Sequence, residues 1–153
     1  MQKLSENISR LIKKDGYYEI SIYDDELTTE NIITGTIKLK KSFPALPKEF
    51  FDVFADRIKN NNFTDKRLND SINHVIDNCI YPTPTIAQFI SFDKRIKLYT
   101  YYDMIKMNDK TQGVFSQFRP IKVDGISKPM YASISDIELY NLEPYKKNYE
   151  NKD

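Results

Sequence analysis

The fold is decided by residues 64–79, which read TDKRLNDSINHVIDNC. Their apolar side chains recur at the spacing of one helix face, and they are Leu68, Ile72, Val75, Ile76 and Cys79. Thr64 is the expected N-cap, because its hydroxyl can accept a hydrogen bond from a free N–H of the first turn. The stretch therefore predicts an amphipathic helix whose apolar face packs against other helices.

Further helices are predicted on both sides of this stretch. Residues 29–42 form one that begins at the N-cap Thr29, and residues 47–60 form one that starts with Pro47. A short helix capped by Thr83 is expected to follow residues 64–79 in the chain. The core expected from these helices consists of Ile33, Ile37, Phe50, Phe54, Ile58, Leu68, Ile72, Val75, Ile76, Ile86, Phe89 and Ile90.

Strand-like patterns dominate the last third of the chain. Residues 113–134 alternate around Asp124-Gly125, a dipeptide typical of hairpin turns. Thr100 is expected to begin a helix before this hairpin, and Ser135 a short helix after it. These patterns predict a small β element flanked by two short helices.

The two ends of the chain carry weaker patterns. Residues 1–15 are predicted to form a short amphipathic helix that Gly16 ends. Residues 17–23 alternate as a strand does, but no strand partner is evident from the sequence. The polar residues 144–153 are predicted to be a disordered tail.

These elements predict a mainly α (α+β) fold, in which a small helical bundle carries a short β-hairpin appendage in the C-terminal third. With 153 residues, of which 40% are hydrophobic, the chain has the length and core material of one domain. That domain is expected to cover 1–143, with a helical core over 29–107 and the hairpin and a short helix over 113–142.

Composition excludes several classes of protein. The 23 Lys and Arg residues nearly balance the 22 Asp and Glu residues, and a net charge of +1 argues against a general binder of polyanions. One cysteine excludes an intramolecular disulfide, and four scattered glycines exclude a P-loop or a dinucleotide-binding fingerprint. The sequence contains no run of 18 apolar residues, so we expect no membrane segment. The free thiol and the absence of a signal-peptide pattern predict a cytoplasmic location.

No catalytic, metal or cofactor site is expected, so the chain is predicted not to be an enzyme. His74 lies between the apolar and polar faces of its helix, and no nucleophile or acid can be assigned to it. Cys79 continues the apolar stripe and is interpreted as a core residue. The acidic turn 24–26 lacks the spacing of a calcium loop.

The best candidate for binding nucleic acid is FDKRIKLYTYY, residues 92–102. Its cations suit phosphates and its rings suit base stacking. The candidate residues are Lys94, Arg95, Lys97, Tyr99 and Tyr101, joined by Arg119, Lys122 and Lys128 of the hairpin. The favoured interpretation is that the rings belong to the core and the cations to a solvated face. Asp93 and Asp103 are expected to offset the cations, so binding of nucleic acid at physiological salt is predicted to be weak or absent.

Residues 29–91 resemble the helicase loader and inhibitor proteins of phage replication modules. The resemblance is carried by Lys40-Lys41-Ser42-Phe43-Pro44, Phe50-Phe51-Asp52-Val53-Phe54, the helix from Leu68 to Ile76, and YPTPTIAQFI at 81–90. It implies a small helical bundle without ATPase motifs that binds a replicative helicase and delivers it to the origin complex. The middle helix of that family usually carries a tryptophan. This sequence contains none, and Phe54 is the nearest equivalent residue.

Residues 98–142 are similar in layout to excisionase-like winged helices. The similarity is carried by LYTYYDM at 98–104, Val123-Asp124-Gly125, KPMYA at 128–132 and Asp136-Ile137-Glu138. It implies a recognition helix between Met107 and Gln117.

The expected function is that of a non-enzymatic DNA-replication accessory protein of a phage or mobile element. It would act as an adaptor that binds a replicative helicase or another replisome partner. The alternatives are a small DNA-binding regulator and a phage structural protein.

Overall fold

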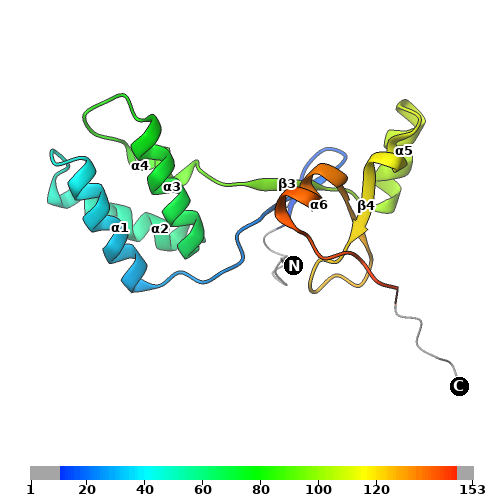
Figure 1. Cartoon of the computed structure of the whole chain (residues 1–153), viewed down its shortest axis with the longest axis horizontal. Coiled ribbons are helices and arrows are strands. Elements are labelled where there is room, and N and C mark those ends of the chain that lie inside the picture. The colour runs from blue at the N-terminus through cyan, green and yellow to red at the C-terminus, as the bar shows by residue number, and fades with distance from the viewer. Residues whose placement is uncertain (1–10, 148–153) are drawn as a thin grey trace, which may run out of the picture. The chain divides into compact units, whose positions relative to one another are not determined.

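The computed structural model describes residues 11–147. They divide into two compact units (Figure 1). The helical unit comprises residues 25–94, and the sheet unit comprises the described residues on either side of it. The combination of α-helices with small antiparallel sheets is an α+β fold, in agreement with the class expected from the sequence. The prediction of one domain over 1–143 stays a prediction.

The helical unit contains α1 (Thr29–Ser42), α2 (Lys48–Asn60), α3 (Asp65–Asn78) and α4 (Ile86–Ile90). The N-cap of α3 is Thr64, as predicted, and its hydroxyl accepts a 3.1 Å bond from the Arg67 N–H. Two N-cap predictions were wrong. The hydroxyl of Thr28, not Thr29, caps α1, and Thr85, not Thr83, caps α4, where the side chain of Gln88 accepts from its N–H.

Three aromatic rings lie at the centre of the helical core. Phe54 of α2 and Phe89 of α4 are fully buried, and their rings meet edge to face at 5.0 Å. The ring of Phe50 stacks on Phe54 at 5.8 Å. Predicted core residues that are buried are Phe54, Ile58, Leu68, Ile72, Val75 and Phe89. Phe50, Ile76, Ile86 and Ile90 are partly buried against them.

The core prediction was wrong for the two α1 residues Ile33 and Ile37. Ile33 and Ile37 are 55% and 50% exposed, and the buried side of this helix instead carries Ile32, Gly35 and Leu39. The reason is close helix packing at the glycine. A Cβ at position 35 would lie only 2.6 Å from the Cδ1 of Ile72 on α3, so the absence of a side chain there lets the two helices approach.

A buried arginine links three parts of the helical unit. Arg67 is 7% exposed, and its guanidinium donates hydrogen bonds to backbone carbonyls of Asn61, Ile90 and Phe92. Its Nε also lies 3.7 Å from a carboxylate oxygen of Asp93. One side chain therefore connects the start of α3 to the ends of α2 and α4.

The sheet unit contains two antiparallel sheets. Strands β1 (Ile12–Lys13), β2 (Tyr18–Ser21) and β3 (Arg95–Leu98) form the first, in that spatial order, and β4 (Phe118–Ile121) and β5 (Met130–Ser133) form the second. The hairpin predicted around Asp124-Gly125 is confirmed by the second sheet. Backbone hydrogen bonds between Tyr99 and Tyr131 join β3 to β5.

Helices complete the sheet unit: α5 (Tyr101–Lys110), the 3-10 helix η2 (Val114–Gln117) and α6 (Ile134–Tyr140). The capping box predicted at the start of α5 is confirmed, since Thr100 and Asp103 exchange 3.1 Å hydrogen bonds. This helix was expected in the helical core over 29–107, but it belongs to the sheet unit. The N-cap of α6 is Ser133, not Ser135.

The predicted helix at the N-terminus was wrong over its described part. Ile12 and Lys13 pair with β2, and Gly16 adopts a φ of +84° in the turn between the strands. Residues 1–10 of that prediction lie outside the described residues. The strand predicted over 17–23 is confirmed as β2, and its partners are β1 and β3. The β structure is therefore larger than a C-terminal appendage.

The described part of the predicted tail contacts β4. The backbone N–H of Tyr145 donates to the carbonyl of Pro120, and the N–H of Lys122 donates to the carbonyl of Glu143. These bonds order the chain at residues 143–145, so the prediction of disorder from residue 144 was wrong at Pro144 and Tyr145. The remainder, 148–153, lies outside the described residues.

Candidate nucleic-acid interface

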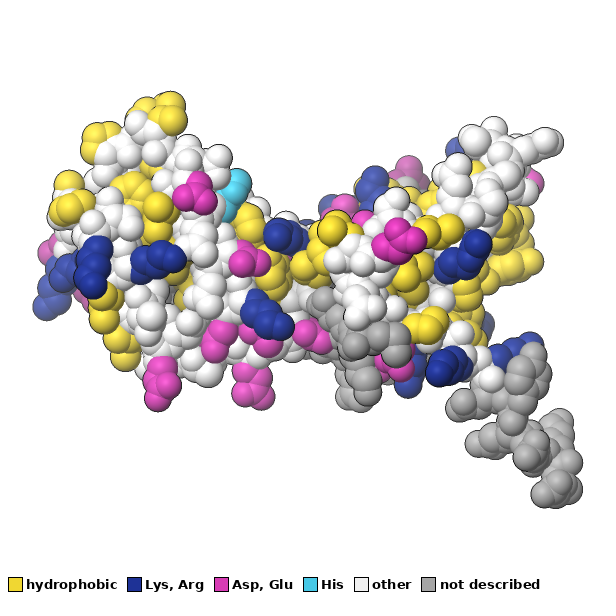
Figure 2. All heavy atoms as spheres, viewed as in Figure 1, with side chains coloured by type: hydrophobic (Ala, Val, Ile, Leu, Met, Phe, Trp, Pro, Cys, Tyr) yellow, Lys and Arg dark blue, Asp and Glu magenta, His cyan; other side chains and the backbone are white. Residues whose placement is uncertain are grey.

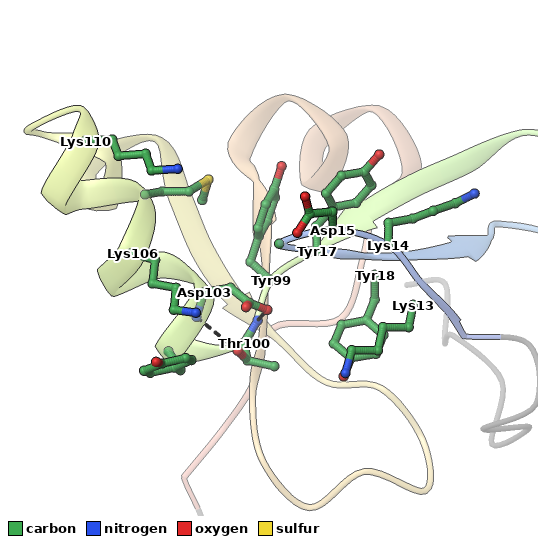
Figure 3. Close-up of a pocket in the computed structure, with 13 residues that line it drawn as sticks. Lys13, Lys14, Asp15, Tyr17, Tyr18, Tyr99, Thr100, Asp103, Lys106 and Lys110 are labelled. Atoms are coloured by element: carbon green, nitrogen blue, oxygen red, sulfur yellow. Dashed lines mark hydrogen bonds between the residues drawn. The ribbon is translucent and has the colours of Figure 1, made fainter.

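A hollow of about 690 Å³ lies in the sheet unit between α5 and the β1–β2 turn (Figure 3). The basic side chains that line it are Lys13, Lys14, Lys106 and Lys110. The aromatic ones are Tyr17, Tyr18, Tyr99 and Tyr102. Ammonium groups can bind phosphates and aromatic rings can stack on bases, so this lining is of the kind that nucleic-acid strands occupy.

Helix α5 supplies one wall of the hollow. Tyr102, Lys106 and Lys110 follow each other at intervals of four residues, which places them on one helix face. Lys106 and Lys110 extend from this helix toward the hollow (Figure 3). The Nζ of Lys106 lies 4.5 Å from the ring centroid of Tyr102, which orients both side chains. The fully buried Met104 anchors the helix to the sheet core.

The β1–β2 hairpin supplies the opposite wall. Gly16 lies in the tight turn of this hairpin, with Lys13 before the turn and Tyr17 directly after Gly16. The ring centroids of Tyr17 and Tyr99 are 6.0 Å apart. The Nζ of Lys97 lies 4.9 Å from the ring centroid of Tyr17. Lys14 extends away from these rings (Figure 3).

Charge at the hollow is locally positive. Four lysines line it with two carboxylates, Asp15 and Asp103, and Asp103 accepts a hydrogen bond from the Thr100 N–H at the start of α5. Elsewhere the basic and acidic side chains are interspersed over the face shown in Figure 2. The balanced net charge of the chain therefore conceals a local cluster of cations.

Tyr99 remains a neutral hydrogen-bonding group at this site. Burial raises the pKa of its phenol, and Tyr17, Asp103 and Asp136 nearby raise the pKa further. The hydroxyl therefore keeps its proton at neutral pH and can donate a hydrogen bond.

The structure places the residues predicted in 92–102 differently from one another. Tyr99 lines the hollow. Lys97 contacts the ring of Tyr17, which is another lining residue. Arg95 lies on the exposed side of β3, with its guanidinium 3.7 Å from the carboxylate of Glu19. Tyr101 is 58% exposed and contacts the rings of Phe115 and Tyr131, outside the lining of the hollow.

Two charged residues of this segment belong to the helical unit and do not line the hollow. Lys94 is exposed, but it is the last residue of the helical unit, whereas the hollow belongs to the sheet unit. Asp93, which was expected to offset the neighbouring cations, pairs with Arg67 within the helical unit.

The predicted hairpin cations do not line the hollow. Arg119, Lys122 and Lys128 are exposed on β4 and in the loop that follows it. Arg119 donates to the backbone carbonyl of Phe118 at 2.8 Å. The interval in which a winged helix would carry its recognition helix holds only the end of α5 and η2.

Sequence reasoning missed most of the lining residues. The spacing of Tyr102, Lys106 and Lys110 along a predicted helix was a usable signal, because it defines one basic and aromatic face. The Lys13-Lys14 pair was assigned to a helix, which hid its position in a hairpin.

His74 and the acidic turn 24–26 make contacts within the helical unit. His74 is exposed, and its ring lies 5.1 Å from that of Phe92. In the acidic turn, the carboxylate of Asp25 accepts a hydrogen bond from the backbone N–H of Lys66 and so caps the start of α3. Within residues 11–147, no group of three or more His, Cys, Asp or Glu side chains could hold a metal ion. In the same residues, no helix is long and apolar enough to cross a membrane.

Comparisons with known proteins add no family to this description. No family model, curated protein or solved structure matches the chain.

Proposed function

We propose that the chain is a non-enzymatic accessory protein that binds nucleic acid through the hollow of its sheet unit. The observation that carries this proposal is the arrangement of Lys106, Lys110 and Lys13 around a set of tyrosine rings. It corresponds to the DNA-binding alternative drawn from the sequence, with a different set of residues. A cytoplasmic location belongs to the same proposal.

Contacts with phosphates would supply most of the affinity. Lys106 and Lys110 lie one helical turn apart, about 6 Å along the helix axis, so they can contact different phosphates of one strand. Because the net charge is only +1, attraction would come from this local cluster and would weaken steeply with salt.

Replacing both Lys106 and Lys110 with alanine is expected to weaken binding of a labelled oligonucleotide. For a single strand each phosphate contact contributes about 0.7 to the slope of log affinity against log salt, so the slope should fall by about 1.4. Fluorescence anisotropy at several salt concentrations measures both quantities.

The matched control removes two lysines from the helical unit. Lys59 and Lys66 are exposed on helices, so Lys59→Ala with Lys66→Ala changes the net charge equally without touching the hollow. If both double variants lose the same affinity and the same slope, binding follows net charge and not this site.

A second candidate function, an adaptor for a protein partner, is supported by the exposed face of α1. Ile33 and Ile37 lie one turn apart, and each is at least half exposed. Exposed large apolar side chains are common at protein contacts. The partner proposed from the sequence is a replicative helicase of a phage or mobile element. Titration with the purified helicase of the organism that carries the gene tests this candidate.

A further inference from the structure

Two tyrosines that line the hollow, Tyr102 and Tyr17, each have a lysine over the ring. On α5 the Nζ of Lys106 lies 4.5 Å from the ring centroid of Tyr102, and at the sheet the Nζ of Lys97 lies 4.9 Å from that of Tyr17. Each pair combines a cation with an aromatic surface at nearly the same separation. Each wall therefore offers the two groups that a nucleotide with an unpaired base requires.

The ring of Tyr102 is the more accessible of the two. The residue is 64% exposed, although Lys106 lies over its ring. An exposed aromatic residue held by a cation is partly ordered before a ligand arrives, which lowers the entropic cost of stacking a base on it. Tyr17 is less exposed and contacts the ring of Tyr99.

The size of the hollow favours a strand over a duplex. About 690 Å³ is within the range of pockets that hold small ligands, which suits a few nucleotide groups. In a duplex the bases are paired and stacked on each other, so their faces cannot reach a tyrosine in a hollow. The lysines could still contact the phosphates of a duplex, but the rings would contribute nothing.

We infer that the hollow binds single-stranded nucleic acid, with one unpaired base stacked on Tyr102 and the adjoining phosphates bound by Lys106 and Lys110. This inference rests on the proposed function and specifies its ligand. Every base has an aromatic face, so the site accepts strands of different sequence.

The experiment measures the affinity of the protein for labelled 12-nucleotide single strands of DNA and RNA and for a DNA duplex of the same length, all at one salt concentration. The full chain is expected to bind at least one single strand roughly fivefold more tightly than the duplex. Tyr102→Ala should weaken binding to that strand by about 5- to 150-fold, the range of one stacked base, and change duplex binding less than twofold. Tyr102→Phe retains the ring and should bind as the wild type does.

Tyr81 provides the matched control, because it is 66% exposed in the helical unit. Tyr81→Ala should leave all affinities unchanged. Equal affinity for strand and duplex, with Tyr102→Ala without effect, would overturn this inference and leave phosphate binding in place. Absence of binding to every probe would overturn the proposed function as well. The two single-strand probes show whether DNA or RNA is preferred.

Discussion

Replacing Arg67 with alanine is expected to lower the free energy of unfolding by about 3–5 kcal/mol, the cost of removing one partner of a buried ion pair. The side chains of Arg67 and Asp93 are each only 9% exposed, so the carboxylate would keep its burial and lose this cation. The backbone carbonyls of Asn61, Ile90 and Phe92 would also lose a charged donor. Urea denaturation followed by circular dichroism measures the change.

The control for this substitution is Arg57→Ala on α2. Arg57 is exposed, so its removal should change the free energy of unfolding by less than about 0.5 kcal/mol. Arg67→Lys keeps the charge but cannot form the same fork of hydrogen bonds, and it should fall between wild type and alanine. Equal urea midpoints for Arg67→Ala and Arg57→Ala would show that the buried arginine does not hold the helical unit together.

Phe54→Ala is expected to destabilise the protein by about 3–5 kcal/mol. The ring is fully buried between Phe50 and Phe89, and its loss removes apolar burial and leaves a cavity among side chains that already contact one another. The same urea titration gives the change in the free energy of unfolding.

Val53 is the neighbouring control on α2. It is 51% exposed, so Val53→Ala should have a small effect on the free energy of unfolding. A Phe54→Ala variant that unfolds at the wild-type urea midpoint would contradict the position assigned to the aromatic core.

The helices of the protein were predictable because their signals are local. The apolar period of residues 64–79 and the hydroxyl of Thr64 gave α3 and its N-cap. The buried face of α1 was not predictable in the same way, because two apolar faces compete on that helix. The choice between them depends on the contact between Gly35 and Ile72, which are 37 positions apart in the chain.

The pairing of the strands could not be predicted from the sequence. The alternation of residues 17–23 indicates a strand, but its pairing with β3 joins segments separated by the whole helical unit. Alternation defines which faces a strand presents and gives no information about its partner.

The candidate site depends on that same pairing. Lys13 and Lys106 lie 93 positions apart in the chain, and the sheet brings their segments to one hollow. Net charge averages over such distances, so the value of +1 does not indicate this local cluster of cations. The segment 92–102 supplied Tyr99, Thr100 and Tyr102 to the lining, and the β1–β2 hairpin and the later part of α5 carry the other lining residues.

The central claim, that the hollow of the sheet unit binds a nucleic-acid strand, is tested most directly by mapping the contact on the isotope-labelled protein. Amide resonances are followed by NMR during titration with an unlabelled 12-nucleotide strand. We predict that shifts concentrate in segments 13–18 and 99–110, which contain the residues that line the hollow. Shifts confined to the helical unit or to the hairpin cations at 119–128, or an unchanged spectrum at millimolar strand, would contradict the claim.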